Sequence, residues 1–474
     1  MNAPSIDFDD VQGTILRGYR VDYARHFVLS IDNVPAMSSL LSSLVSGTNG
    51  LPKITTALRL ESKPESFLNL SFTNTGLSKM GLSDEQLQTF DSSFQLGATN
   101  PSVANNIGDV GDSAPSNWID GLNDGGQVHL LISLWARDSK EVLESISATL
   151  ASAFSGVATI ILQHDANALP DNKIHFGYRD SIAQPTVKGA PPAKYEPDDQ
   201  PEVATGEFLL GYKNEIGGTY TVSPTELSLN SSYAAFRILE QDVAGFNAIL
   251  DSFAQTTGME TEMVAAKVCG RWRNGNPLTL SPDQQEPVLP TEQLNNFTYV
   301  KPEAVNDDTL GLTCPVGSHI RRNNPRNAGV VGTDSTHHRI TRRAMPYGKV
   351  YNPQNPDDGN RGLIGYFINA SITNQFEFLT GQWDQTSTFV KSAEAPGGSP
   401  AGNAVFNISG EDVFLGVNDP SNSSFTFPKD GVNGSNNVNV TGFGRTIITR
   451  GSVYCFFPSI TGLRYLANLA ASQG

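Results

Sequence analysis

The order of strand-like and helix-like runs in the first third of the chain most constrains its fold. Four runs with the alternation or length of strands lie at 25–32, 66–72, 127–135 and 157–163. Segments with an apolar face, typical of helices, lie at 35–46 and 138–154. The order strand–helix–strand–strand–helix–strand is that of a ferredoxin-like α+β domain. Between the second and third strands, Ser83 and the Gln86 that follows it predict the start of a short capped helix.

A second series of the same kind begins near Ser232. A strand at 232–242 is followed by segments with helical spacing at 242–255 and 260–272, a strand at 362–370, a helix at 373–383, and a closing strand and helix. We therefore predict an α+β fold of two ferredoxin-like domains with antiparallel sheets. The predicted domains are residues 1–185 and 232–474, joined by an irregular crossing at 186–231 that packs on the protein because its GEFLLGY stretch is apolar.

Composition excludes several classes of protein. The 474 residues carry a net charge of −16, which argues against binding to nucleic acid or to an anionic membrane surface. No apolar run approaches the length of a membrane-spanning helix. The N-terminus has no apolar signal-peptide core and the three cysteines form no CxxC pair, so we expect a cytoplasmic protein, although a mature secreted chain would look the same. We expect a monomer or small homo-oligomer.

The stretch from Cys314 to Gly348 concentrates candidate chemistry, because it holds three of the seven histidines among many arginines. His319 lies between CPVGS and IRRNNPR, where a neutral imidazole could bind iron and the arginines could pair with carboxylates. The alternative, which is more common for a single histidine, is a loop residue in a basic patch. His337 and His338 are adjacent and do not share a face, so they are interpreted as surface or supporting residues.

Two further stretches contain candidates for acid–base and electron-transfer roles. Asp180, in GYRDS, is either a turn-capping carboxylate or a general acid/base. Arg342, before AMPYG, either forms an ordinary ion pair or stabilises negative charge that develops during a reaction. Tyr347 and Trp383 are oxidisable and could carry an electron from the surface, although core packing is the commoner role of such residues.

Several stretches together resemble the dye-decolourising peroxidases, a family of haem peroxidases. They are FGYRDSIAQP, GEFLLGYKNE, CPVGSHIRRNNPR, RRAMPYG and the closing strand and helix, and the resemblance runs from VQGTILRGYR to FFPSITGLRYLANLA. It implies two ferredoxin-like domains, with haem held mainly by the second.

The resemblance also implies roles for five residues. His319 would be the proximal ligand of the haem iron, and Asp412 would accept a hydrogen bond from its imidazole. Asp180 and Arg342 would be the distal carboxylate and arginine that activate peroxide. Arg321 would bind a haem propionate.

The activity implied is the oxidation of bulky dyes and phenols by hydrogen peroxide, with one haem b in each chain. Such reductants would give up single electrons at the surface, through Tyr347 or Trp383.

Two positions depart from the family pattern. Ser181 stands where the family usually has glycine, so the turn after Asp180 is expected to differ. Gly365 stands near a usual bulky aromatic residue, so a wider distal pocket is expected. These departures leave open a haem-binding or haem-handling protein with incidental peroxidase activity. The remaining alternative is a binding module without haem.

Overall fold

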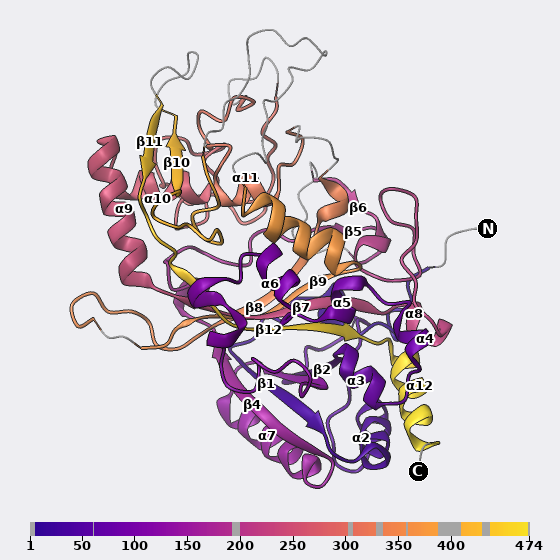
Figure 1. Cartoon of the computed structure of the whole chain (residues 1–474). Helices are drawn as coiled ribbons and strands as arrows, with labels where there is room; N and C mark the ends of the chain where they lie inside the picture. Colours follow the sequence, from indigo (N-terminus) through magenta and orange to yellow (C-terminus); the bar gives the residue numbers. More distant parts are fainter. Residues whose placement is uncertain are drawn as a thin grey trace.

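The computed structural model describes residues 5–59, 61–191, 200–301, 307–328, 335–356, 359–386, 409–428 and 437–472. Its largest element is an eight-stranded sheet in the order β4-β1-β3-β2-β12-β7-β9-β8 (Figure 1). The strands are β1 (Tyr23–Ile31), β2 (Ser66–Phe72), β3 (Leu130–Ala136), β4 (Ala158–Asn167), β7 (Ser232–Gln241), β8 (Thr341–Tyr347), β9 (Gly362–Asn369) and β12 (Ile447–Phe457).

Each half of the sheet repeats the same arrangement. Within each half the fourth strand lies beside the first, then come the third and the second, and neighbours pair antiparallel. The main helices are α2 (Val34–Ser46) and α7 (Lys140–Phe154) in the first half, and α9 (Val243–Thr257) and α10 (Thr261–Cys269) in the second. Two π-helical turns, η6 (Ile372–Phe376) and η7 (Leu379–Trp383), stand where a helix was predicted. The predicted pair of ferredoxin-like units is confirmed.

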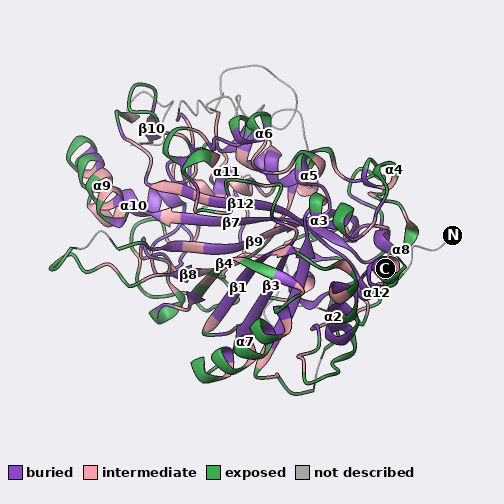
Figure 2. Cartoon of the chain, turned by 60° about the horizontal axis from the view of Figure 1, so that its bottom comes forward, coloured by how far each residue is buried: buried purple, intermediate pink, exposed green. Residues whose placement is uncertain are grey.

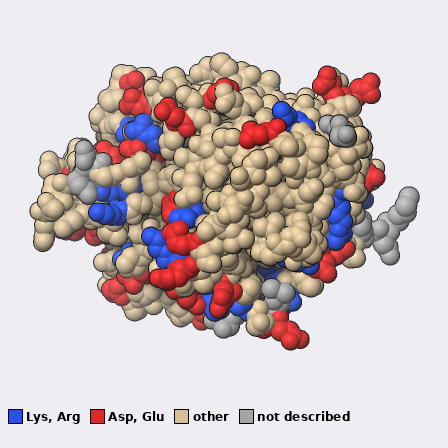
Figure 3. Space-filling model, turned by 90° about the horizontal axis from the view of Figure 1, so that it is seen from below, with Lys and Arg blue, Asp and Glu red and all other residues tan. Residues whose placement is uncertain are grey.

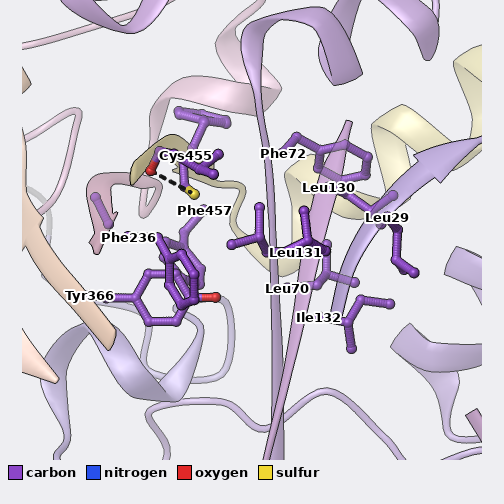
Figure 4. Close-up of a cluster of buried hydrophobic side chains, with 14 of the residues drawn as sticks. Leu29, Leu70, Phe72, Leu130, Leu131, Ile132, Phe236, Tyr366, Cys455 and Phe457 are labelled. Carbon is purple, nitrogen blue, oxygen red and sulfur yellow. Dashed lines mark hydrogen bonds between the residues drawn. The ribbon is translucent and has the colours of Figure 1, made fainter. Parts of the chain in front are cut away.

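The two halves share one core. β2 and β12 are joined at Phe72 and Phe456, and the edge strands β4 and β8 also approach each other, so the sheet curls toward a barrel. Side chains of both halves meet inside it, as Figure 4 shows for Leu70, Ile132 and Phe457. Burying each large apolar side chain contributes about 1.5–3 kcal/mol.

A polar bridge crosses this core. The Tyr366 hydroxyl lies 2.7 Å from Ser133 Oγ, which lies 2.7 Å from His26 Nδ1, and all three side chains are buried. Burial lowers the pKa of His26 to about 3, so the imidazole is neutral at ordinary pH. The bridge therefore links the two halves without a buried charge.

The last helix returns to the first half of the chain. α12 (Ile460–Ala471) packs against α2 (Figure 1), and Ser38 Oγ donates a hydrogen bond of 2.7 Å to the Ala467 carbonyl. A helix of the second predicted domain (232–474) therefore packs on the first (1–185), and the two also share a core. The boundaries between the domains stay a prediction. The crossing between them is packed on the protein, with Phe208 and Leu209 fully buried.

β8 is an element that the sequence patterns did not predict within the stretch from Cys314 to Gly348. The structure contains the short helix α11 (His319–Asn323) and the strand β8 in this stretch. Among the described strands, β8 pairs with β9 alone, and it contains Pro346. An edge strand accommodates proline and arginine because one side of its backbone needs no partner strand.

The remaining elements are short. The Ser83 prediction is confirmed, because Ser83 and Gln86 form a capping box at the start of α4. Their bounds are α1 (Gly13–Leu16), α3 (Asn74–Lys79), α4 (Asp84–Leu87), α5 (Ser92–Leu96), α6 (Pro101–Asn106), α8 (Thr225–Ser228), β5 (Thr186–Val187), β6 (Glu202–Val203), β10 (Ser424–Phe427), β11 (Val438–Thr441), η1 (Gly111–Ser113), η2 (Pro115–Asn117), η3 (Pro170–Asn172), η4 (Thr205–Glu207) and η5 (Thr336–His338).

The surface is mixed in character. Figure 2 shows buried strands at the centre and exposed faces on outer helices such as α7 and α9. On the face in Figure 3, acidic and basic side chains are interspersed rather than gathered by sign. Among the described residues, no helix combines the length and the apolar character needed to cross a bilayer.

Candidate functional site

His319 is the first residue of α11, and two contacts fix its imidazole. Its Nδ1 lies 3.1 Å from Asp412 Oδ2, and its ring lies 5.1 Å from the Phe414 ring. Burial opposes protonation of His319, but the Asp412 carboxylate outweighs it, so the pKa of the imidazole lies above its usual value. With Nδ1 donating to Asp412, Nε2 carries the lone pair that can bind a metal.

Asp412 is held as a carboxylate inside the protein. It is fully buried, and its Oδ1 accepts hydrogen bonds of 2.8 Å from the backbone N–H groups of Phe414 and Leu415. Burial alone would raise the pKa of Asp412, but His319, Arg322 and these hydrogen bonds hold it below the usual range. The loop therefore presents a stable negative charge to His319.

Asp384, which sequence analysis missed, is a second buried carboxylate beside His319. Ligand atoms of His319, Asp384 and Asp412 all lie within 4.8 Å of one another. Asn323 Nδ2 donates a hydrogen bond of 2.9 Å to Asp384 Oδ1. Burial and the nearby Asp412 raise the pKa of Asp384 to about 7. Its only sequence signal was its position directly after Trp383.

Arg322 is a buried cation next to Asp412. Its side chain is fully buried and donates hydrogen bonds of 2.5–2.9 Å to the carbonyls of Trp383, Thr386 and Gly410. Its Nε lies 4.0 Å from Asp412 Oδ2. We call His319, Arg322, Asn323, Asp384 and Asp412 the histidine side of the site.

The arginine side consists of Asp180, Ser181, Gln184 and Arg342. Arg342 lies on β8, and its guanidinium donates a hydrogen bond to the Ala183 carbonyl. Burial lowers the pKa of Arg342 and the negative charge of Asp180 opposes that shift, so the two side chains are electrostatic neighbours. The charge of Arg342 also lowers the pKa of His319, which places the two sides within electrostatic range of each other.

The turn after Asp180 keeps a left-handed residue. Ser181 has φ +60°, a conformation that glycine adopts freely and that costs other residues roughly 1–2 kcal/mol. Serine at this position therefore adopts the left-handed conformation that glycine would favour, rather than a different turn.

Gly365, where sequence analysis expected a wider pocket, lies at a close approach of two strands. A Cβ at this position would lie 2.1 Å from the Arg343 carbonyl oxygen and 2.4 Å from Ala344 Cα. Glycine is thus required by the close approach of β9 and β8.

Arg321 has a different partner from the predicted propionate. Its guanidinium is buried, lies 2.9 Å from Asp308 Oδ2 and donates to the Cys314 carbonyl at 2.9 Å. It also lies over the Tyr299 ring. These contacts turn Arg321 away from a ligand role and make it an anchor for the loop that precedes His319.

Tyr347 and Trp383 are buried rather than exposed, so a dye at the surface would not touch either side chain directly; electron transfer through them stays a prediction. Tyr347 is 3% exposed and Trp383 is 4% exposed. Tyr347 packs edge-on against His164, and Trp383 packs against His338 and Phe378. Both positions therefore fit core packing, which is the commoner role of large aromatic residues.

The groups that face the site fit a haem. His319, Arg339 and Arg342 each remain at least partly accessible to solvent. Arg339, whose pKa burial and Arg342 lower to about 10, has no acidic ion-pair partner in the described part of the chain, nor has Arg342. An iron that takes Nε2 of His319 and carboxylates that pair with arginine suit this set.

Comparisons with known proteins agree with this geometry. Residues 10–170 match the family described as the DyP dimeric alpha+beta barrel domain. A dye-decolorizing peroxidase of Mycena epipterygia is 29% identical over 498 residues, covering 98% of this chain and 87% of that protein. One from Mycetinis scorodonius is 27% identical over 493 residues, covering 98% and 88%.

Solved structures agree as well. A dye-decolorizing peroxidase in complex with 2,6-dimethoxyphenol superposes with a TM-score of 0.79 at 26% identity, covering 98% of this chain and all of that one. The fold of the peroxidase from Auricularia auricula-judae matches with a TM-score of 0.80 over 99% of this chain. The family model, the curated relatives and the solved structures therefore all identify the dye-decolourising peroxidase family, and the chain is a haem peroxidase.

Proposed function

We propose that the protein uses hydrogen peroxide to oxidise dyes and phenolic compounds in one-electron steps, with Asp180 and Arg342 acting on the peroxide. The observation that carries the proposal is the proximity of two unlike sets of side chains. An imidazole oriented by a buried carboxylate lies within electrostatic range of an arginine, and an acidic side chain neighbours that arginine. The complex of a related peroxidase with 2,6-dimethoxyphenol supports phenols as one class of reductant.

The histidine side would hold one haem b in each chain through His319 Nε2. Asp412 makes the imidazole a more basic ligand, because the carboxylate accepts the Nδ1 proton. Arg339 replaces Arg321 as the propionate partner in this proposal, because its guanidinium donates only to the neutral Asn324 amide among the hydrogen bonds of the described residues, whereas that of Arg321 is bound to the carboxylate of Asp308.

On the arginine side, the residues act on the proton and charge of the peroxide. The bound haem supplies a redox-active iron that can deliver two electrons to hydrogen peroxide. Asp180 accepts a proton from one peroxide oxygen and delivers it to the other, which leaves as water. Arg342 donates hydrogen bonds to the oxygen that gains negative charge. Two reductant molecules then return one electron each, and two protons complete the second water.

The test is the rate at which the Soret spectrum responds to hydrogen peroxide. Asp180→Asn keeps the shape of the side chain but cannot accept the proton, so we expect a loss of about 10²–10⁴-fold. Arg342→Leu removes the donors and should cost about 10²–10³-fold. Asp171→Asn, an exposed acidic residue of the same region, is the matched control and should change the rate less than about twofold.

The alternative, a haem-handling protein, predicts a different outcome of the same test. Haem would bind, but wild-type protein and both variants would respond equally slowly to hydrogen peroxide. Full reactivity of Asp180→Asn would remove that carboxylate from the mechanism.

A further inference from the structure

We propose that Gln184 is a positioning residue that sets where Arg342 stands relative to Asp180. The inference rests on the proposed function of those two residues. Gln184 Oε1 accepts a hydrogen bond of 3.1 Å from the backbone N–H of Arg342, and its Nε2 donates one of 3.2 Å to the Arg342 carbonyl. The side-chain amide of Gln184 thus forms hydrogen bonds with both the backbone N–H and the backbone carbonyl of Arg342, the residue proposed to act on peroxide.

This pairing answers a need created by the sheet. β8 is an edge strand, so the backbone groups on its outer side have no partner strand. Arg342 is the Cα partner of Phe367 on β9, yet its N–H and carbonyl bond to Gln184. The amide of Gln184 therefore stands in for one residue of a ninth strand.

The same segment also holds the far end of Arg342. The guanidinium donates a hydrogen bond to the carbonyl of Ala183, the residue before Gln184. Two consecutive residues thus fix both the backbone and the charged group of Arg342. Gln184 follows Asp180 by only four positions. A shift of the segment that contains them relative to β8 would therefore change the separation of Asp180 and Arg342.

A second contact holds the other end of this segment to the same strand. His175 Nε2 lies 2.8 Å from the Tyr347 carbonyl, so residues 175–184 bridge the edge of β8 from Tyr347 to Arg342. Asp180 lies within this bridge, and its backbone N–H donates a hydrogen bond of 2.8 Å to the Asn172 carbonyl. Residues 175–184 therefore contain Asp180, and the strand to which they are bonded, β8, contains Arg342.

Glutamine is the side chain that meets these demands. An amide offers a donor and an acceptor on one planar group, as a peptide does, whereas an ionised glutamate offers acceptors only. Methionine has similar length and makes neither hydrogen bond. The pairing of β8 with β9 does not involve Gln184, so we expect variants to keep the sheet and the histidine side intact.

The experiment compares Gln184→Met and Gln184→Glu with wild-type holoprotein. We expect the bimolecular rate with hydrogen peroxide to fall about tenfold, as for the loss of one or two hydrogen bonds. Cyanide affinity of the ferric protein, which reports the donors facing a bound anion without turnover, should fall in parallel. The Soret maximum without added ligand and the reduction potential should stay unchanged. Gln163→Met, an exposed glutamine on β4, is the matched control and should leave all four quantities unaltered.

A double variant separates positioning from a general structural effect. If Gln184 acts through Arg342, adding Gln184→Met to Arg342→Leu should slow the peroxide reaction by less than about twofold further. A full tenfold further loss would overturn the proposal, as would unchanged rate and cyanide affinity in both single variants. If Arg342→Leu itself reacts like wild type, the proposed function fails instead, so the two failures are distinguishable.

Discussion

The histidine side and the arginine side of the site are built in opposite ways. On the histidine side, Asp412 and Arg322 are fully buried, and backbone groups satisfy Asp412 Oδ1 and the Arg322 terminal nitrogens. On the arginine side, Asp180 and Arg342 are exposed, and Arg342 is positioned by the segment that follows Asp180. One side is enclosed by the protein, and the other is open, with Arg342 held by its backbone and by one hydrogen bond from its guanidinium.

The difference follows from what each side must do. A metal ligand and its carboxylate need constant geometry and charge, which burial and complete hydrogen bonding provide. Groups that act on a small incoming molecule must stay accessible, so the protein cannot enclose them as completely. Variants on the histidine side should therefore change stability and haem properties, whereas variants on the arginine side should change the reaction with peroxide.

The largest expected effect is at the buried cation of the histidine side. Arg322→Met should lower the free energy of unfolding by about 3–5 kcal/mol, because it leaves Asp412 and several carbonyls without their partner. Urea unfolding of the variant measures this, with the exposed Arg20→Met as control. A loss below about 1 kcal/mol would contradict the claim that this side is sealed by its internal bonds.

Asp412→Asn should have the next largest effect. The amide keeps the shape but removes the charge that makes His319 basic, so haem affinity or peroxide reactivity should fall about 10–100-fold. The reduction potential of the haem should rise, because the less basic imidazole stabilises oxidised iron less well. An unchanged potential would show that the Asp412 charge does not reach the iron.

Glu207 provides a buried carboxylate for comparison with Asp412, because burial rather than a neighbouring cation dominates its pKa. Burial raises the pKa of Glu207 to about 7, above the unfolded value of 4.5. The native protein therefore retains this proton where the unfolded chain has lost it, and its stability falls as pH rises from about 4.5 to 7. Glu207→Gln should be neutral near pH 4 and stabilising by about 2 kcal/mol at pH 8, after allowance for solvent screening. Unfolding curves at both pH values test this, and equal differences would refute it.

The smallest effect concerns the turn on the arginine side. Ser181→Gly should relieve the positive φ and stabilise the protein by up to about 1 kcal/mol. The peroxide rate should change less than about threefold, because the turn already has the conformation that glycine prefers. Thermal unfolding and the peroxide rate measure the two parts, and a destabilised variant would show that Ser181 contributes contacts that offset its strain.

Local sequence patterns predicted most of the fold. The strands and helices of the first half follow from apolar periodicity, and the closing strand and helix were also expected. β8 was missed because its sequence, TRRAMPY, has no apolar alternation and depends on pairing with β9. Non-local pairing of this kind leaves no local signal.

Site residues that lie in recognisable motifs could be predicted from the sequence, whereas those placed by side-chain packing could not. The structure brings His319 together with Asp412, and Arg342 into the electrostatic field of Asp180. Asp384 was missed because no local feature distinguishes a buried carboxylate from an exposed one. The pairing of Arg321 with Asp308 and the burial of Tyr347 arise from side-chain direction, which sequence spacing does not specify.

The most direct test is the visible spectrum of the haem-supplemented protein before and after one equivalent of hydrogen peroxide. It should be recorded for wild type, His319→Ala and Asp180→Asn. We predict a Soret band in the wild type that changes within seconds of peroxide addition. The band should be lost or strongly shifted in His319→Ala, and in Asp180→Asn it should be normal but slow to respond. A Soret band that His319→Ala leaves unchanged, or one in the wild type that does not respond to peroxide, would contradict the division of roles between the two sides.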